Sequence, residues 1–294
     1  MADSLWNLAT KTLGGLQFWG DVCAFHGWRI QHNVFTNHFR LLDPSDVRQA
    51  WGSREQCLAA LQAIQQERQL PPMTGKVVVL IHGIVRSSGC FRPMEPELQA
   101  AGFTTLGFDY PSTRVSIARC DEYLRHFLES LDGVEEIHFI VHSMGGLVVR
   151  AYLMGTPDPR IRRMVMLGVP NLGARMANHV KDLMLFKAIY GPAGQQLVEE
   201  AAGLIPTLPT PEFEFAVIAG ARGTPTGFNP LIPGDDDGTV SVSATWLPGA
   251  ADFMTVPVLH SFLMSDPATI AASRRFLETG ALRESGVPEP IPRL

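Results

Sequence analysis

The amino-acid sequence predicts an α/β protein with a mostly parallel central sheet and helices on both faces. Two observations lead to this prediction. Short runs of apolar, largely β-branched residues recur along the chain, and stretches with helical spacing of apolar residues separate them. Strands that alternate with helices form βαβ units, in which the strands are parallel. With 294 residues, the chain can form one large domain or two small ones.

The expected strands begin at residue 76. Residues 76–81 read Lys-Val-Val-Val-Leu-Ile, which is typical of a strand that is buried on both faces. Further apolar runs follow at 104–108, 137–141, 164–167 and 213–218, with a weaker one at 253–258. Helices are expected between them at 94–101, 116–131, 144–154 and 266–279. In such a sheet, active sites gather at the carboxyl ends of the strands.

Residues 1–70 precede this pattern and differ from it. Residues 1–45 are rich in aromatic side chains and poor in charge, whereas 53–68 predict a helix with a capping box of Ser53 and Gln56. We therefore expect an aromatic, helical N-terminal extension of residues 1–70, packed on a main domain of residues 71–294. The alternative for the aromatic segment is a peripheral contact with a membrane surface or with another subunit, because exposed aromatic side chains need a partner.

Composition excludes several function classes. The net charge is −5 and no basic cluster occurs, so nucleic acid is not expected as a partner. The four cysteines are scattered and none forms a CxxC pair, which is typical of free thiols in a reducing compartment. No uncharged run reaches the roughly 18 residues of a membrane span, and the N-terminus does not resemble a secretory signal. We therefore expect a cytoplasmic protein, either free or at a membrane periphery.

The most informative segment is the one that surrounds Ser143. It reads Ile137-His-Phe-Ile-Val-His-Ser143-Met-Gly-Gly, a buried strand followed at once by a helix. A serine at such a sharp strand-to-helix turn is a nucleophile elbow, which presents the hydroxyl above the sheet. The pattern departs from G-x-S-x-G at Val141, where the first glycine is usual.

With this segment, the chain resembles the α/β-hydrolase family, and within it the lipase-like branch of bacterial triacylglycerol lipases and GPI inositol-deacylase-like proteins. The resemblance covers about residues 76–280. Its motifs are Val79-Leu-Ile-His-Gly-Ile84, Phe108-Asp-Tyr-Pro-Ser112, His142-Ser-Met-Gly-Gly146, Leu167-Gly-Val-Pro-Asn171, Asp237-Gly-Thr-Val240 and His260. It implies the α/β-hydrolase fold for the main domain.

The resemblance also implies a set of catalytic residues. Ser143 would be the nucleophile, His260 the base and Asp237 the acid that orients it, in the chain order of this fold. The backbone N–H groups of Ile84 and Met144 would form the oxyanion hole. His179 is the only other histidine after Ser143, and we expect it to have a packing or surface role.

Asp235 and Asp236 are expected to form a solvated acidic turn, with a calcium loop as the alternative.

The expected activity is that of a serine hydrolase cleaving small-molecule or lipid esters with apolar acyl groups, without a cofactor or metal ion. An acyltransferase with the same triad and a non-catalytic binding protein on a hydrolase fold are the alternatives. Residues of about 171–211 form an insertion where hydrolases of this fold often have a cap. Its apolar residues would either pack on the sheet or form a mobile lid over an acyl-binding cleft.

Overall fold

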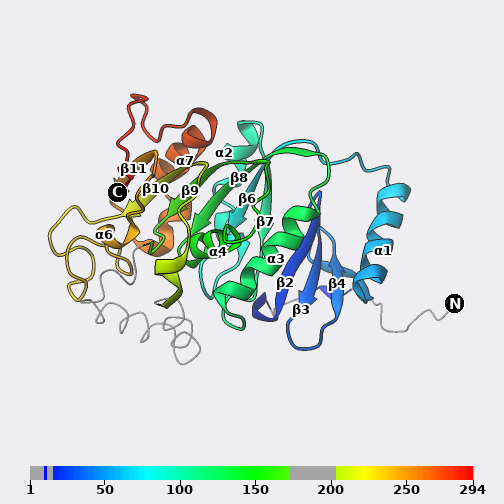
Figure 1. The fold of residues 1–294 in the computed structure, drawn as a ribbon. Coiled ribbons are helices and arrows are strands. Elements are labelled where there is room, and N and C mark those ends of the chain that lie inside the picture. The colour runs from blue at the N-terminus through cyan, green and yellow to red at the C-terminus, as the bar shows by residue number, and fades with distance from the viewer. Residues whose placement is uncertain (1–9, 12–15, 172–202, 294) are drawn as a thin grey trace.

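Six parallel strands form the central sheet of the protein. The computed structural model describes residues 10–11, 16–171 and 203–293 (Figure 1). The strand order is β11-β10-β9-β8-β6-β7, and every neighbouring pair is parallel. The strands are β6 (Gly75–Ile81), β7 (Thr104–Phe108), β8 (Val134–His142), β9 (Ile161–Leu167), β10 (Glu214–Gly220) and β11 (Asp252–Val256). Each apolar run found in the sequence overlaps one of these strands, so the predicted parallel sheet is confirmed.

Helices cover both faces of this sheet, as the sequence predicts. They are α2 (Glu95–Ala100) and α7 (Pro267–Thr279) on one face and α3 (Ile117–Glu129) and α4 (Met144–Tyr152) on the other. Along β6, Val77, Val79 and Ile81 join the core under α3 and α4. The alternate residues Val78 and Leu80 join the core under α2 and α7. The continuous apolar run at 76–81 therefore has a simple cause, since both faces of the strand are buried.

The helix ends follow local capping rules. Before α1 (Arg54–Glu67), Ser53 accepts a hydrogen bond from Gln56 N, while the Gln56 side chain accepts one from Ser53 N. This is the capping box that the sequence predicts. The caps of α3 and α7 are Ser116 and Asp266, each of which accepts a hydrogen bond from a backbone N–H three residues later. The remaining short elements are η1 (Leu16–Phe18), η2 (Ser88–Phe91), η4 (Ile205–Thr207), α6 (Val242–Thr245) and η5 (His260–Ser265).

The N-terminal residues form a second sheet, which corrects the expectation of a helical extension. This sheet is antiparallel, in the order β1-β5-β4-β3-β2, and α1 packs on it. Its strands are β1 (Thr10–Lys11), β2 (Trp19–Phe25), β3 (Trp28–Asn33), β4 (Phe39–Leu42) and β5 (Val47–Gly52). Within residues 16–70, then, only α1 and the single turn of η1 are helical, and most of the aromatic segment is β-structure.

Strand β2 packs closely along α3 of the main sheet (Figure 1). Gly20 lies so near the Tyr123 ring that a Cβ atom at this position would overlap it. Two hydrogen bonds also join β2 to the main sheet region, from Asp21 N to Asp109 O after β7 (2.8 Å) and from Ala24 N to Ser130 Oγ at the end of α3 (3.1 Å). The N-terminal sheet therefore contacts the helix layer of the central sheet, and the division into domains at residue 70 remains a prediction.

Most of the expected cap at about 171–211 lies outside the described residues, as does His179. Among the helices that the structure describes, none is both long and apolar enough to cross a membrane.

Candidate active site

Ser143 occupies a strained turn between β8 and α4. Its backbone angles are φ 52° and ψ −125°, a region that residues other than glycine rarely adopt. Ser143 N donates a hydrogen bond to Leu167 O on the neighbouring strand, at 2.9 Å. Such a turn is the geometry of a nucleophile elbow, because it lifts the serine side chain out of the strand at the carboxyl edge of the sheet.

The residues around Ser143 explain the spacing of the motif. At Gly145, a Cβ atom would lie 2.5 Å from Ile81 O and 2.7 Å from His82 O, so only glycine lets α4 approach β6 this closely. Val141, at the position where glycine is usual, is fully buried in the core under α3 and α4. The departure from the common pattern is thus accommodated by packing on that side of the sheet.

His260 and Asp237, which are 23 residues apart in the sequence, lie in direct contact. His260 Nδ1 donates to Asp237 Oδ2 at 2.7 Å, and both side chains are buried. The other carboxylate oxygen, Oδ1, accepts from Thr239 N (3.0 Å) and Val240 N (2.7 Å). Gly168 packs against the pair, where a Cβ atom would be 3.0 Å from His260 Nδ1. Because Nδ1 carries the proton in this contact, Nε2 of the neutral ring has a free lone pair.

His260 Nε2 has no hydrogen-bond partner among the described residues, although it is buried. A hydrogen bond to Ser143 Oγ is therefore not formed in this structure. His142, next to Ser143, links the two regions, since its Nε2 donates to His260 O at 3.0 Å and the two rings are 4.5 Å apart. Burial, with His260 nearby as a smaller cause, holds the pKa of His142 well below its ordinary value. His142 is thus a neutral donor that fixes the backbone of His260.

The backbone N–H groups of Ile84 and Met144 are both free of acceptors within the part of the chain that the structure describes. Met144 begins α4, and the helix dipole favours negative charge at this end. Ile84 follows His82 and Gly83, and His82 is held by a contact of its Nδ1 with Gly83 O (2.6 Å) and by stacking on Tyr110 (4.4 Å). His82 therefore has a structural role in this loop.

Comparison with known families adds to this geometry. A family model described as the alpha/beta hydrolase fold matches residues 76–188, which include most of β6 as well as Ser143 and α4. Together with the six-stranded parallel sheet and the strand-turn-helix around Ser143, this decides the fold. The chain has the α/β-hydrolase fold.

The individual proteins that this chain resembles are distant in sequence. Methylesterase 3 of Arabidopsis thaliana is 29% identical over 80 residues, which are 24% of this chain and 30% of the plant protein. Among solved structures, an esterase from Rhodococcus sp. has 17% identity and a TM-score of 0.44, with 69% of this chain and 90% of that chain covered. An α/β hydrolase from a lagoon-sediment metagenome in Morocco has 18% identity and a TM-score of 0.47, with 71% and 94% covered. These comparisons do not identify the lipase-like branch.

The loop that carries Asp237 also corrects one expectation. Asp236 is fully buried and accepts from Gly238 N (2.6 Å) and Asn229 N (3.0 Å), while Asp235 accepts from Arg222 N (2.8 Å). These two carboxylates therefore hold the loop together and do not form a solvated acidic turn. Among the described residues, no group of three His, Cys, Asp or Glu side chains is arranged to hold a metal ion.

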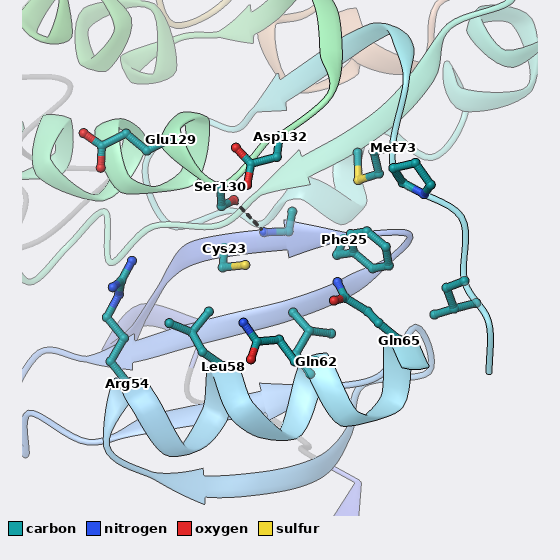
Figure 2. Close-up of a pocket in the computed structure, with 14 residues that line it drawn as sticks. Cys23, Phe25, Arg54, Leu58, Gln62, Gln65, Met73, Glu129, Ser130 and Asp132 are labelled. Carbon is teal, nitrogen blue, oxygen red and sulfur yellow. Dashed lines mark hydrogen bonds between the residues drawn. The ribbon is translucent and has the colours of Figure 1, made fainter. Parts of the chain in front are cut away.

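Sequence reasoning assigned no role to His142, although it stands inside the elbow motif directly before Ser143. A cavity of about 530 Å³ was not foreseen either. It lies between α1, β2 and the C-terminal end of α3, and its lining includes Arg54 and Leu58 of α1, Cys23 of β2 and Ser130 at the end of α3 (Figure 2). None of its 14 lining residues is one of the predicted site residues, so it is separate from the candidate active site.

Proposed function

We propose that this protein cleaves carboxylic esters, with Ser143 as nucleophile, His260 as base and Asp237 as the acid that orients it. The observation that carries the proposal is the 2.7 Å contact between His260 Nδ1 and Asp237 Oδ2, with Nε2 buried and unpartnered among the described residues. A histidine held in this tautomer can accept a proton only at Nε2, as a serine nucleophile requires.

In the proposed reaction, Ser143 Oγ attacks the ester carbonyl carbon while His260 Nε2 takes the hydroxyl proton. The resulting oxyanion is bound by the N–H groups of Ile84 and Met144, which have no other acceptor among the described residues. The intermediate then expels the alcohol, which takes the proton from His260, and leaves an acyl group on Ser143. Water attacks this acyl-enzyme by the same steps, releasing the carboxylic acid and restoring the serine.

We propose further that the acyl group is apolar. Exposed apolar side chains flank the residues of the proposed site, since Val85 follows Ile84, and Leu259 and Phe262 lie on either side of His260 in the sequence. Their exposed fractions are 55%, 41% and 57%, which is high for side chains of this kind. Each methylene that is removed from water contributes about 0.8 kcal/mol. A butyryl ester would then exceed an acetyl ester in kcat/KM by up to about 15-fold.

The first experiment is labelling with a fluorophosphonate, followed by turnover of p-nitrophenyl esters. We expect the label on Ser143 of the wild type and none on Ser143→Ala. If neither protein is labelled and neither hydrolyses any ester, the alternative of a non-catalytic hydrolase-fold protein is correct. Methyl esters belong in the substrate panel, because the plant relative is called a methylesterase.

A second experiment tests the acyl preference. Phe262→Ala should lower the preference for butyryl over acetyl esters, whereas Phe35→Ala should not. Phe35 is a matched control, because it is 66% exposed but lies in the N-terminal sheet region. Equal effects of the two changes would contradict an acyl contact at Phe262. The insertion at about 171–211, which is the other candidate for acyl binding, lies mostly outside the described residues.

Acyl transfer to an alcohol is the alternative reaction, and product analysis with added alcohol distinguishes it from hydrolysis. A peripheral membrane contact and a cytoplasmic location remain predictions from the sequence. Trp28 of the aromatic segment is buried in the N-terminal sheet and is not available for such a contact.

A further inference from the structure

The loop of residues 82–86, which carries Ile84, contains a strained backbone position. Val85 has φ 60°, in the left-handed region, where a β-branched residue is an outlier. Its side chain is 55% exposed, so burial of the side chain does not stabilise this conformation. Such positions persist only when the surrounding structure holds them, and they concentrate at functional sites.

Two side chains outside the loop form a ring of hydrogen bonds with it. Val85 N donates to Ser112 Oγ (3.1 Å), and Ser112 Oγ donates to Gln17 Oε1 (3.0 Å). Gln17 Nε2 then donates back to the loop, at Arg86 O (3.4 Å). Ser112 is fully buried, so its hydroxyl cannot exchange these partners for bulk water. The ring therefore holds the backbone before and after the Val85–Arg86 peptide group, at Val85 N and at Arg86 O.

Gln17 belongs to the N-terminal sheet region and is fixed there. It lies in η1, which leads directly into β2, and the next residue, Phe18, accepts a hydrogen bond from Val34 N (2.9 Å). Thr113 Oγ1 also donates to Gln17 Oε1 (2.9 Å), but within the described part of the chain no hydrogen bond joins Thr113 to residues 82–86.

A second connection runs from β2 to Ser88, two residues beyond this loop. Asp21 Oδ2 accepts from Asp109 N (2.7 Å), and Asp109 Oδ1 accepts from Ser88 N (2.6 Å). Arg29, on β3, donates to the other Asp109 oxygen at 2.8 Å. Two independent paths thus lead from the N-terminal sheet, through the residues that follow β7, to the segment around Ile84.

We propose that Gln17 and Ser112 are positioning residues, through which the N-terminal sheet holds the loop of residues 82–86 so that Ile84 N–H can bind the oxyanion. This inference rests on the proposed ester hydrolysis for its catalytic part, since the ring matters to turnover only if Ile84 binds the oxyanion. The ring itself does not depend on the reaction. It predicts that the loop is less protected from hydrogen exchange when Ser112 or Gln17 is changed.

The test compares Ser112→Ala with Thr113→Val in the full-length protein. Both variants remove a hydroxyl donor to Gln17 Oε1, but only the first removes the acceptor of Val85 N. Amide hydrogen exchange of residues 83–88 should be about tenfold faster in Ser112→Ala, a factor typical of one lost hydrogen bond, and unchanged in Thr113→Val. Gln17→Ala, at a partly exposed position, should give the same direction of change and serves if Ser112→Ala does not fold.

Steady-state kinetics then separates positioning from a structural role. For Ser112→Ala we expect kcat to fall about tenfold with KM within twofold of wild type, because the oxyanion forms only in the transition state. The affinity for a trifluoromethyl ketone, whose serine adduct carries an oxyanion, should fall by the same factor. Unchanged exchange, an unchanged kcat, or equal losses in Thr113→Val would overturn the inference. If exchange increases but the wild type hydrolyses no ester, the proposed function is wrong and the catalytic role falls with it.

Discussion

Replacing Asp237 with asparagine tests how the proposed base is oriented. The asparagine amide has two orientations, and the structure decides between them. Thr239 N and Val240 N both donate to Asp237 Oδ1, so the amide oxygen of the new side chain should occupy that position. Its NH2 group then faces His260 Nδ1 and requires a lone pair there, which moves the ring proton to Nε2. A ring in that tautomer cannot accept the proton of Ser143.

The other orientation keeps the correct tautomer but loses both backbone hydrogen bonds. At about 1 kcal/mol each, they disfavour it by about 2 kcal/mol, so roughly one molecule in 30 would have it. Loss of the carboxylate charge beside the imidazolium lowers the rate further. We therefore expect kcat of Asp237→Asn to fall by at least about 30-fold, and toward the 10⁴-fold scale known for such a change in a serine triad.

The assay is steady-state hydrolysis of a p-nitrophenyl ester, with Asp236→Asn as the matched control. Asp236 is the preceding residue and equally buried, but its carboxylate bonds Gly238 N and Asn229 N and does not contact His260. An asparagine side chain at position 236 can still accept these hydrogen bonds, so kcat should stay close to wild type. Retention of more than a tenth of kcat in Asp237→Asn, or an equal loss in Asp236→Asn, would refute the reasoning.

Three further predictions concern the nucleophile, its turn and the N-terminal sheet. Ser143→Ala should lower kcat by several orders of magnitude with little change in Tm, and near-normal turnover would rule out Ser143 as nucleophile. Gly145→Ala should lower the free energy of unfolding, measured in urea, by about 1–3 kcal/mol, because the new Cβ atom would lie 2.5 Å from Ile81 O. Gly89→Ala is the control, because its Cβ atom would lie 3.5 Å from its nearest neighbour, Ser87 Oγ. Burial raises the pKa of Asp21 from 3.8 to about 7 in the folded state. At pH values between these two, the carboxyl is protonated in the folded state and ionised in the unfolded state. The wild type should therefore lose more stability than Asp21→Asn when unfolding in urea is compared at pH 5 and pH 8, and equal losses would mean that Asp21 is ionised throughout.

The central sheet could be predicted from the sequence because its strands are buried on both faces. Five consecutive residues of β6, from Val77 to Ile81, have no exposed surface, which leaves a continuous apolar run in the sequence. The contact of His260 with Asp237 could not be derived in this way. β11 lies between the two residues, so only the resemblance to a family indicated that the chain brings them together.

The N-terminal sheet was missed because polar side chains lie in its interior. Asp21, Gln31 and Arg40 stand on three successive strands, are almost completely buried, and bond one another through Gln31. The alternation of apolar and polar residues that identifies a half-buried strand is therefore absent. The hairpin between β2 and β3 turns at His26-Gly27, where both residues have positive φ, and this pair lacks the Asn-Gly or Asp-Gly signal of such turns.

The close packing of β2 on α3 has a consequence for truncation. A chain that starts at residue 71 would retain all six strands of the central sheet, yet it would uncover the face of α3 that Gly20 covers at Tyr123. It would also leave the Asp109 carboxylate without Arg29, its cationic partner. We expect such a chain to aggregate on expression, whereas the full-length chain should remain soluble. Residues 16–70 are then an integral layer of the molecule, and a soluble, active protein from residue 71 onward would show the opposite.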